Sequence, residues 1–251
     1  MGDTMVAPPM PEEQPADSFL SRALGVFISP GRAFESIVHK PDFIAPLIVA
    51  IVAAIAITET MMAKIGMERI VRKSIELSSR ASQMSAEQLQ QAAHQGATIG
   101  AIIARVAELV GVPIYLLVVA AVGLFIVNVI FGAATNFKVD LSVVCYANLV
   151  GLVGAVLALV VIFFGDPEQF NPQNFIPSNA GFFLNPHEVS KPLYTIATSF
   201  DIFTAWFLVV ASIGLSIATA RKVRPVPIFL TFFGLWLVWV LAKAGLSMLG
   251  G

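Results

Sequence analysis

Residues 202–248 read IFTAWFLVVASIGLSIATARKVRPVPIFLTFFGLWLVWVLAKAGLSM, and this stretch decides the fold class. It holds two apolar runs, at about 202–220 and 226–248, separated only by the five residues RKVRP at 221–225. A helix needs about 20 apolar residues to cross the roughly 30 Å hydrocarbon core of a bilayer. Each run meets that length, so the stretch predicts an antiparallel pair of membrane-spanning helices.

Three more apolar runs of spanning length precede this pair, at about 43–63, 108–132 and 141–164. Backbone groups inside lipid must be satisfied within the chain, which α-helices do. The sequence therefore predicts an all-α, polytopic integral membrane protein with about five transmembrane helices plus interfacial helices. Four spans remain the alternative count, if the run at 43–63 lies flat on the membrane.

The composition agrees with a membrane location. Hydrophobic residues make up 57% of the chain and charged residues 12%, whereas soluble domains carry about 25% charged residues. A soluble fold of this composition would expose large apolar patches. The net charge of −1 gives no reason to expect a nucleic-acid partner. The single cysteine, Cys145, cannot form an internal disulfide and is expected to pack inertly.

The N-terminal region divides into two parts. Residues 1–16 (MGDTMVAPPMPEEQPA) are acidic and proline-rich, and we expect a disordered tail. Residues 17–42 show helical apolar spacing that Pro30-Gly31 interrupts, which predicts one or two helices before the five-span domain at 43–249. These helices either lie in the membrane interface, where basic Arg22, Arg32 and Lys40 suit anionic lipid, or pack on the bundle.

Two connecting segments carry their own patterns. Residues 67–80 predict an amphipathic helix, and the capping-box spacing of Ser85 and Gln88 predicts a new helix that runs on into the second span. Residues 165–200 interleave five prolines with aromatic residues, which excludes long helices and favours a segment that lies on the membrane or caps the bundle. The role of this segment is open at the level of sequence.

Cationic residues give the expected orientation. With the N-terminus inside, the inner side carries seven and the outer side six. The tight cluster at 221–224 has most weight, because short loops obey the positive-inside rule best. The expectation is a cytoplasmic N-terminus. The inner residues are Arg22, Arg32, Lys40, Lys138, Arg221, Lys222 and Arg224, and the outer residues are Lys64, Arg69, Arg72, Lys73, Arg80 and Lys191.

Polar residues in or beside apolar spans are costly, so each is a candidate for function. Arg105 and Glu108 are three residues apart, as in an ion pair on one helix face. Asn128 and Asn148 are expected to bond across helices. Most of these residues lie near span ends, which favours interface anchors and interhelical contacts; the alternative is a polar transport path. The full set of candidates is Glu59, Arg105, Glu108, Asn128, Asn148, Asp201 and Lys243.

Catalytic patterns are missing from the sequence. The histidines His39, His94 and His187 lie in three separate segments, and no H-E-x-x-H pair is present. Neither a G-x-S-x-G elbow nor a P-loop occurs. We therefore expect no catalytic residues, no metal, no cofactor and no enzymatic activity.

Three stretches carry a family resemblance: FISPGRAFESIVHKPDFIAPLIV (27–49), GAATNFKVDLSVVCYA (132–147) and SFDIFTAWFLVVASIGLSIA (199–218). Their order and spacing over roughly residues 20–248 resemble the bacterial branch of the Yip (Ypt/Rab-interacting protein) family. The residues that carry the resemblance are Pro30, Phe34, Pro41, Pro46, Tyr146, Asp201, Phe203, Trp206, Gly214 and Trp236.

The resemblance implies five spans and a non-enzymatic role as a scaffold or adaptor in membrane organisation or trafficking. A small transporter or channel is the alternative. It also implies a multi-pass protein of the bacterial inner (plasma) membrane. The expected partners are the lipid bilayer and either other membrane proteins or a second copy of this chain. The sequence lacks the Asp-Leu-x-Gly-Pro motif of eukaryotic members, so a GTPase partner is not expected.

Overall fold

The computed structural model describes residues 18–78, 83–168, 170–186 and 188–249. The tail expected at 1–16 lies outside these residues. Within them the chain is helical, and its single β-type contact is an isolated bridge between Asn179 and Asp201. The prediction of an all-α, polytopic membrane protein is confirmed.

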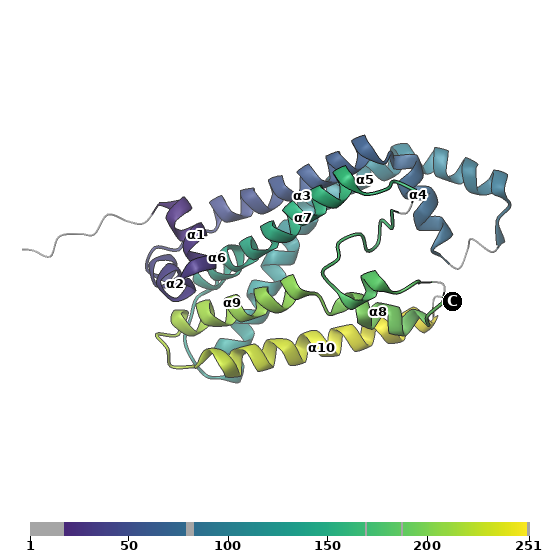
Figure 1. The fold of residues 1–251 in the computed structure, drawn as a ribbon. Helices are drawn as coiled ribbons and strands as arrows, with labels where there is room; N and C mark the ends of the chain where they lie inside the picture. The colour runs from purple at the N-terminus through teal and green to yellow at the C-terminus, as the bar shows by residue number, and fades with distance from the viewer. Residues whose placement is uncertain (1–17, 79–82, 169, 187, 250–251) are drawn as a thin grey trace, which may run out of the picture.

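The long helices run side by side along one axis (Figure 1). In chain order the described elements are α1 (Phe19–Ile28), α2 (Pro30–His39), α3 (Ile44–Lys64), α4 (Met67–Glu76), α5 (Ala86–Phe125) with the π-helical η2 (Ile126–Ile130), α6 (Phe137–Ala147), η3 (Asn148–Val150), α7 (Gly151–Phe164), η4 (Ala180–Phe183), α8 (Lys191–Ser199), α9 (Ile202–Ala218) and α10 (Pro225–Leu249).

Four described stretches are long and apolar enough to cross a membrane: Ile44–Lys64, Ala86–Ile130, Phe137–Phe164 and Pro225–Met248. The remaining expected span, α9, is apolar but only 17 residues long. α8 and α9 both pack along α10, and the rings of Phe200 and Trp236 lie 5.0 Å apart at the junction. α8 and α9 therefore cover the length of α10 together, as a helix broken at Phe200-Asp201.

The third span begins earlier than the sequence suggested. The spans expected at about 108–132 and 141–164 leave residues 133–140 as a connection, but α6 begins at Phe137 and includes Lys138 and Asp140. Asn136 caps this helix by accepting a hydrogen bond from the backbone N–H of Val139 at 3.1 Å. The polar character of these residues marks the first turn of a helix rather than a connection.

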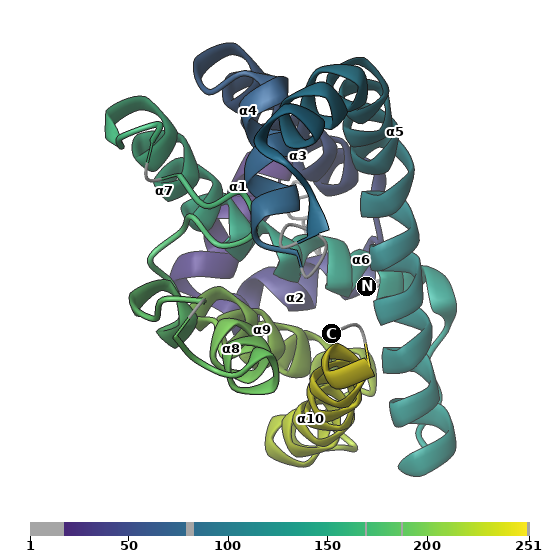
Figure 2. The same cartoon turned by 90° about the vertical axis from the view of Figure 1, so that its right-hand side faces the viewer.

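Successive helix ends lie at alternate ends of the bundle (Figure 1). We call one end the hairpin side; it carries the α1–α2 hairpin and the connections 131–136 and 219–224. The other end is the loop side, with α4, the segment 165–200 and the end of α10. Figure 2 views the bundle from the loop side, with α5 and α10 at its edge.

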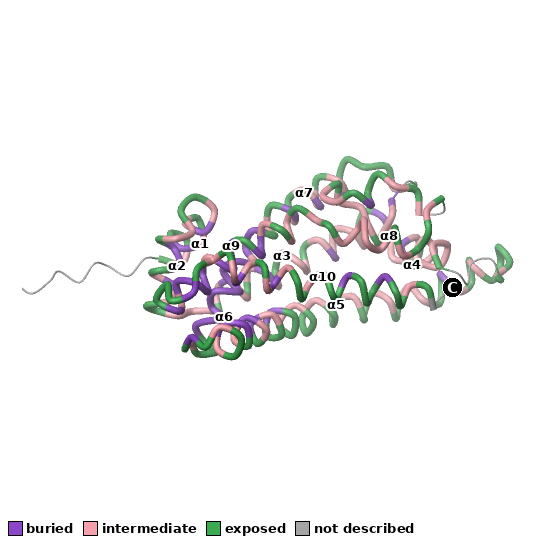
Figure 3. Tube along the Cα trace, turned by 90° about the horizontal axis from the view of Figure 1, so that it is seen from below, coloured by how far each residue is buried: buried purple, intermediate pink, exposed green. Residues whose placement is uncertain are grey.

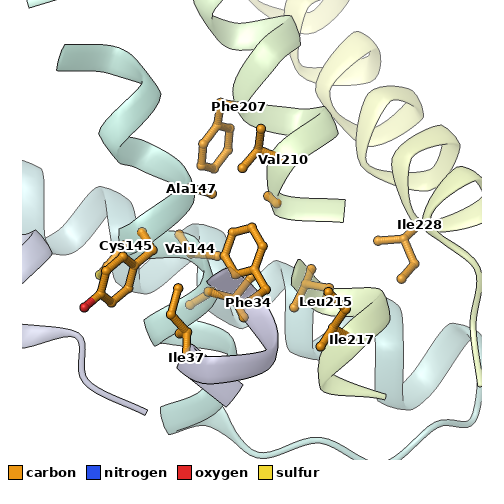
Figure 4. Close-up of a cluster of buried hydrophobic side chains, with 14 of the residues drawn as sticks. Phe34, Ile37, Val144, Cys145, Ala147, Phe207, Val210, Leu215, Ile217 and Ile228 are labelled. Carbon is orange, nitrogen blue, oxygen red and sulfur yellow. The ribbon is translucent and has the colours of Figure 1, made fainter. Parts of the chain in front are cut away.

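Burial is concentrated toward the hairpin side (Figure 3). α2 packs against α6 and α9, and Phe34 and Ile37 have no exposed surface. Every residue of α6 from Val139 to Ala147 is buried, including Cys145. Figure 4 shows Phe34 pointing into side chains of α6 and α9. The hydrophobic core therefore lies at the hairpin side, where the α1–α2 hairpin packs against α6 and α9.

Gly214 on α9 makes this packing possible. A Cβ atom at that position would lie 2.4 Å from Cγ1 of Val143 and 2.9 Å from two ring atoms of Phe34. A Cβ atom essentially never approaches another heavy atom this closely, so glycine at this position makes room for the ring of Phe34. One missing side chain on α9 thus fixes where α2 lies.

The α1–α2 hairpin is locked by a buried arginine. Arg22 is 5% exposed; its Nε donates to Oγ of Ser36 at 3.1 Å and its Nη1 donates to the backbone oxygen of Lys40 at 2.9 Å. A cation at the C-terminus of α2 is favourable because carbonyl groups there lack helical partners. Arg22 is therefore buried within the hairpin. The hairpin packs on the bundle while Leu20, Leu24 and Ile28 of α1 are exposed, so its location in the membrane interface stays a prediction.

The capping box at the start of α5 is confirmed: Ser85 and Gln88 bond each other's backbone N–H groups at 2.9 and 3.2 Å. α5 and η2 form 45 continuous residues, which is roughly 68 Å at 1.5 Å per residue. α4 packs antiparallel along the first part of α5, where Gly96 and Gly100 face Val71 and Met67. This helical pair extends beyond the other spans on the loop side.

Gly214→Ala tests the close approach of α2 and α9. Overpacking costs about 1–3 kcal/mol, whereas Gly→Ala in a helix otherwise gains up to about 1 kcal/mol. We expect a lower melting temperature in detergent. Gly234→Ala on α10, where a Cβ would meet no atom within 4 Å, is the control and should match or exceed wild type. Equal stability of both variants would contradict the packing described.

Single cysteines test the alternation of the helix ends. Cysteine at Asn136 or Lys222 should react with a membrane-impermeant maleimide from one side of the membrane. Cysteine at Glu76 or Gln173 should react only from the other side. The buried Cys145 should leave wild type unlabelled. Labelling of Asn136 and Gln173 variants from the same side would rule out this arrangement.

Candidate functional site

The intramembrane polar residues are engaged with one another in small groups. Arg105 on α5 donates from Nε to Oε1 of Glu59 on α3 at 2.5 Å and from Nη2 to Oε2 at 3.0 Å. This two-point contact is the strongest geometry between an arginine and a carboxylate. Both side chains are about half exposed by the protein itself, so the pair lies at the outer surface between the two helices.

The expected pairing of Arg105 with Glu108 is wrong. Glu108 instead accepts a hydrogen bond from Oγ1 of Thr58 at 3.1 Å, while the partner of Arg105 is Glu59. The spacing of three residues allowed a pair on one helix face. Glu59 on α3 can instead face the planar guanidinium of Arg105 across the α3–α5 interface and accept two parallel hydrogen bonds, which is the contact that forms.

Asn128 forms a local network rather than a bond across spanning helices. It lies in the π-helical turn η2; its Oδ1 accepts from the backbone N–H of Thr135 at 2.9 Å and its Nδ2 donates to the Thr135 carbonyl at 3.1 Å. The hydroxyl of Thr135 donates to Oδ2 of Asp140 at 2.8 Å. The expectation for Asn148 also differs: it lies in η3, and its side chain makes no hydrogen bond within the described residues.

Asp140 is a polar residue that sequence reasoning missed. It is fully buried, and its Oδ1 has no hydrogen-bond partner among the described residues. Its carboxylate stands in the first turn of α6, where the helix dipole favours negative charge. The sequence did offer one indication: Asp140 follows Asn136, a favourable N-cap residue, by four positions, which places it in the first turn of a helix.

Asp201 caps α9 at the break between α8 and α9. Its Oδ1 accepts from the backbone N–H groups of Phe203 at 2.8 Å and Thr204 at 3.1 Å, and its Oδ2 accepts from the hydroxyl of Ser178. The backbone N–H of Ile202 donates to the Ser178 carbonyl at 3.0 Å. The break is therefore closed by the segment 165–200. Lys243, the last polar candidate, is exposed on α10.

The segment 165–200 is held in place at several points. Arg69 on α4 pairs with Glu168 at 2.8 Å, and Nδ2 of Asn171 donates to the hydroxyl of Tyr194 at 3.2 Å. Asn174 and Asn179 exchange two side-chain hydrogen bonds at 2.9 and 3.2 Å. These contacts give the segment a defined shape between α4, α7 and α8.

The residues that carry the family resemblance meet mainly in the hairpin core. Phe34, Tyr146 and Gly214 lie in its centre. Trp206 packs edge-on against Phe27 at 5.8 Å. Phe203 fills the space over Gly154, where a Cβ would lie 3.0 Å from its ring.

The other residues of the resemblance lie at helix ends or pack against one. Pro30 begins α2, Pro41 stands between α2 and α3, and Pro46 lies in the first turn of α3. Trp236 packs at the α8–α9 break.

The two ends of the bundle differ in how their cations are partnered. On the loop side Arg69, Arg72 and Lys73 lie within 4 Å of a glutamate, whereas Lys64 and Lys191 have no carboxylate within 4 Å among the described residues. On the hairpin side the described ion pair joins Arg221 to Glu35 at 2.7 Å. The other exposed cations there have no carboxylate within 4 Å among the described residues: Arg32, Lys40, Lys138, Lys222 and Arg224.

No group of three or more histidine, cysteine, aspartate or glutamate side chains that could hold a metal is found among the described residues. The expectations of no catalytic residue and no cofactor stay predictions. What the geometry offers is a set of intramembrane polar groups of which Glu59, Arg105, Glu108 and Asn128 have partners, a basic hairpin side and a structured cap on the loop side.

Comparison with known proteins gives two matches. Residues 24–250 match the family model described as the Yip1 domain. The chain is also 32% identical over 196 residues to the membrane protein YknW of Bacillus subtilis, covering 76% of this chain and 75% of that protein. No solved structure matches.

The pair of Glu59 and Arg105 can be tested by removing one or both charges. Glu59→Leu or Arg105→Leu should lower the melting temperature in detergent, because each leaves a lone charge near the membrane. The double replacement should recover much of the loss, since no unpaired charge remains. Glu108→Leu serves as the control and should have a smaller effect, because it removes one hydrogen bond to Thr58. A double variant as unstable as the worse single variant would contradict this pairing.

Proposed function

Because this chain belongs to the Yip1 domain family and is a multi-pass membrane protein, we propose that it acts as a non-enzymatic scaffold or adaptor that organises other membrane proteins. We further propose that it lies in the bacterial plasma membrane, with the hairpin side, and hence the N-terminus, in the cytoplasm. Its partners are the bilayer and membrane proteins with acidic segments.

One observation carries the proposal: four of the candidate intramembrane residues, Glu59, Arg105, Glu108 and Asn128, are already bonded to neighbours in separate groups. Glu59 binds Arg105, Glu108 binds Thr58, and Asn128 binds Thr135. A transport path needs polar side chains that face a common water-filled passage. Side chains satisfied in separate pairs favour a structural role within the bundle.

The hairpin side supplies the surface for partners. Among the described residues its exposed cations have no carboxylate within 4 Å, apart from Arg221 with Glu35. They stand on α2, on the first turn of α6 and on the connection 219–224, whose Val223 is part of the buried core. Free cations on a rigid surface attract acidic segments and speed their association. The cationic cluster at 221–224 stands in a short connection on this side, which supports the cytoplasmic location through the positive-inside rule.

A small transporter is the second candidate, and one observation favours it. α8 and α9 form a broken helix, and helices of this kind hold substrates in several transporter folds. In this chain the carboxylate at the break already accepts three hydrogen bonds from Ser178, Phe203 and Thr204. The scaffold proposal is therefore the stronger.

Cross-linking in native membranes followed by mass spectrometry tests the adaptor role. The variant Arg32→Gln/Lys222→Gln should recover several-fold fewer cross-linked proteins than wild type, because it removes free cations of the hairpin side. It retains Arg221 and Arg224 to preserve topology. The control Arg72→Gln/Lys73→Gln removes two cations of the loop side and should match wild type.

Two results would count against the adaptor role. The first is an identical set of cross-linked proteins for wild type and both variants. The second is solute uptake by proteoliposomes of purified protein that is abolished in Asp201→Asn, which would favour the transporter instead.

A further inference from the structure

The segment 165–200, together with the ends of neighbouring helices, borders two adjoining open cavities on the loop side. The first, which we call the aromatic chamber, has a volume of about 340 Å³; its lining is mostly apolar and includes Ile162, Phe170, Phe175, Phe182 and Leu184, with Asp166, Asn171 and Asn174 as its polar members. The second, the polar chamber, has a volume of about 670 Å³ and is lined by Glu76, Gln173, Ser190, Lys191, Thr195 and Ser247 among others. Pro186 and Tyr194 border both chambers.

The walls of the aromatic chamber are fixed by packing. Phe170 and Ile162 are buried, and the rings of Phe170 and Phe175 lie 5.1 Å apart. The hydroxyl of Tyr194 is held by Asn171. Cavities of roughly 300–1,000 Å³ with apolar walls and a few placed polar groups are the usual form of small-molecule sites.

Both chambers lie where membrane spans end. Val161 and Ile162 of the last turns of α7, and Ile65 just after α3, border the aromatic chamber. Ser247 in the last turn of α10 borders the polar chamber, together with Glu76 at the end of α4. A mostly apolar cavity and a polar cavity thus adjoin beside the loop-side ends of the spans, and near span ends acyl chains give way to lipid head groups.

The polar chamber carries both signs of charge. Lys191 offers an ammonium group, with hydroxyls of Ser190 and Thr195 on the same wall. Glu76 offers a carboxylate whose described ion pairs, to Lys73 at 3.4 Å and Arg72 at 3.7 Å, are longer than charge-assisted hydrogen bonds of about 2.7–2.9 Å. A ligand that suits both groups carries an anionic and a cationic centre.

We propose that these chambers hold one phospholipid with an amine-bearing head group. An acyl chain occupies the aromatic chamber, the phosphate pairs with Lys191, and the amine donates to Glu76. The proposal concerns the loop side and is independent of the adaptor role assigned to the hairpin side. It also gives the segment 165–200 a function that its sequence did not indicate.

Native mass spectrometry of the full chain tests the site. The delipidated protein is offered phosphatidylethanolamine and phosphatidylglycerol in equal amounts. Wild type should retain one phosphatidylethanolamine in preference to phosphatidylglycerol, whose head group lacks the amine. Lys191→Gln and Glu76→Gln should each weaken retention by about tenfold, the effect of one charge-assisted contact. Lys222→Gln on the hairpin side is the control and should behave as wild type.

Two further measurements test the acyl chain and the head group of the lipid separately. Leu184→Trp fills the aromatic chamber and should abolish retention, and circular dichroism identifies any variant that fails to fold. Glycerophosphoethanolamine, which has no acyl chains, and diacylglycerol, which has no phosphate, should both fail to bind. Retention by a folded Lys191→Gln or Leu184→Trp variant equal to that of Lys222→Gln would overturn the proposal, as would equal retention of both phospholipids by wild type.

Discussion

The approach of Phe34 to the backbone of α9 is the contact on which the arrangement depends. Gly214 leaves a space that the ring fills, and Val143 of α6 closes it from the other side. With α2 held there, Arg22 can reach the C-terminus of α2 and tie α1 to it. The cations of α2 and of the connection 219–224 then share one surface, joined by the pair of Glu35 and Arg221.

Packing density falls from the hairpin side to the loop side. The larger buried cluster gathers α1, α2, α6 and α9, whereas the smaller consists of Ile65, Ile70, Ile162 and Phe170. The loop side relies instead on discrete polar contacts, such as Arg69 with Glu168. A segment held by a few polar contacts around cavities has room for a ligand, and a close-packed core does not. The two proposed roles follow this division.

Much of the fold could be predicted from the sequence because its signals are local. Apolar length gave the spans, Ser85 and Gln88 gave the start of α5, and Pro30-Gly31 gave the division of the hairpin. The failures concern partners distant in the chain. Arg22 seemed suited to lipid, yet its acceptors lie on α2. Arg105 had a plausible partner three residues away, but the partner chosen lies 46 residues earlier. The break at Asp201 escaped notice because Ser178 closes it from a loop.

The position of Phe34 has a consequence for biosynthesis. The hairpin leaves the ribosome before its binding site on α9, which follows about 180 residues later, at Gly214. At translation rates of about 5–20 residues per second, the hairpin waits on the order of ten seconds or more before α9 exists. During that interval α6 is made as well, but the face of Phe34 that packs on α9 has no partner helix. The hairpin is thus made long before the helix that fixes its position, and its apolar face must be shielded by other surfaces until α9 is inserted.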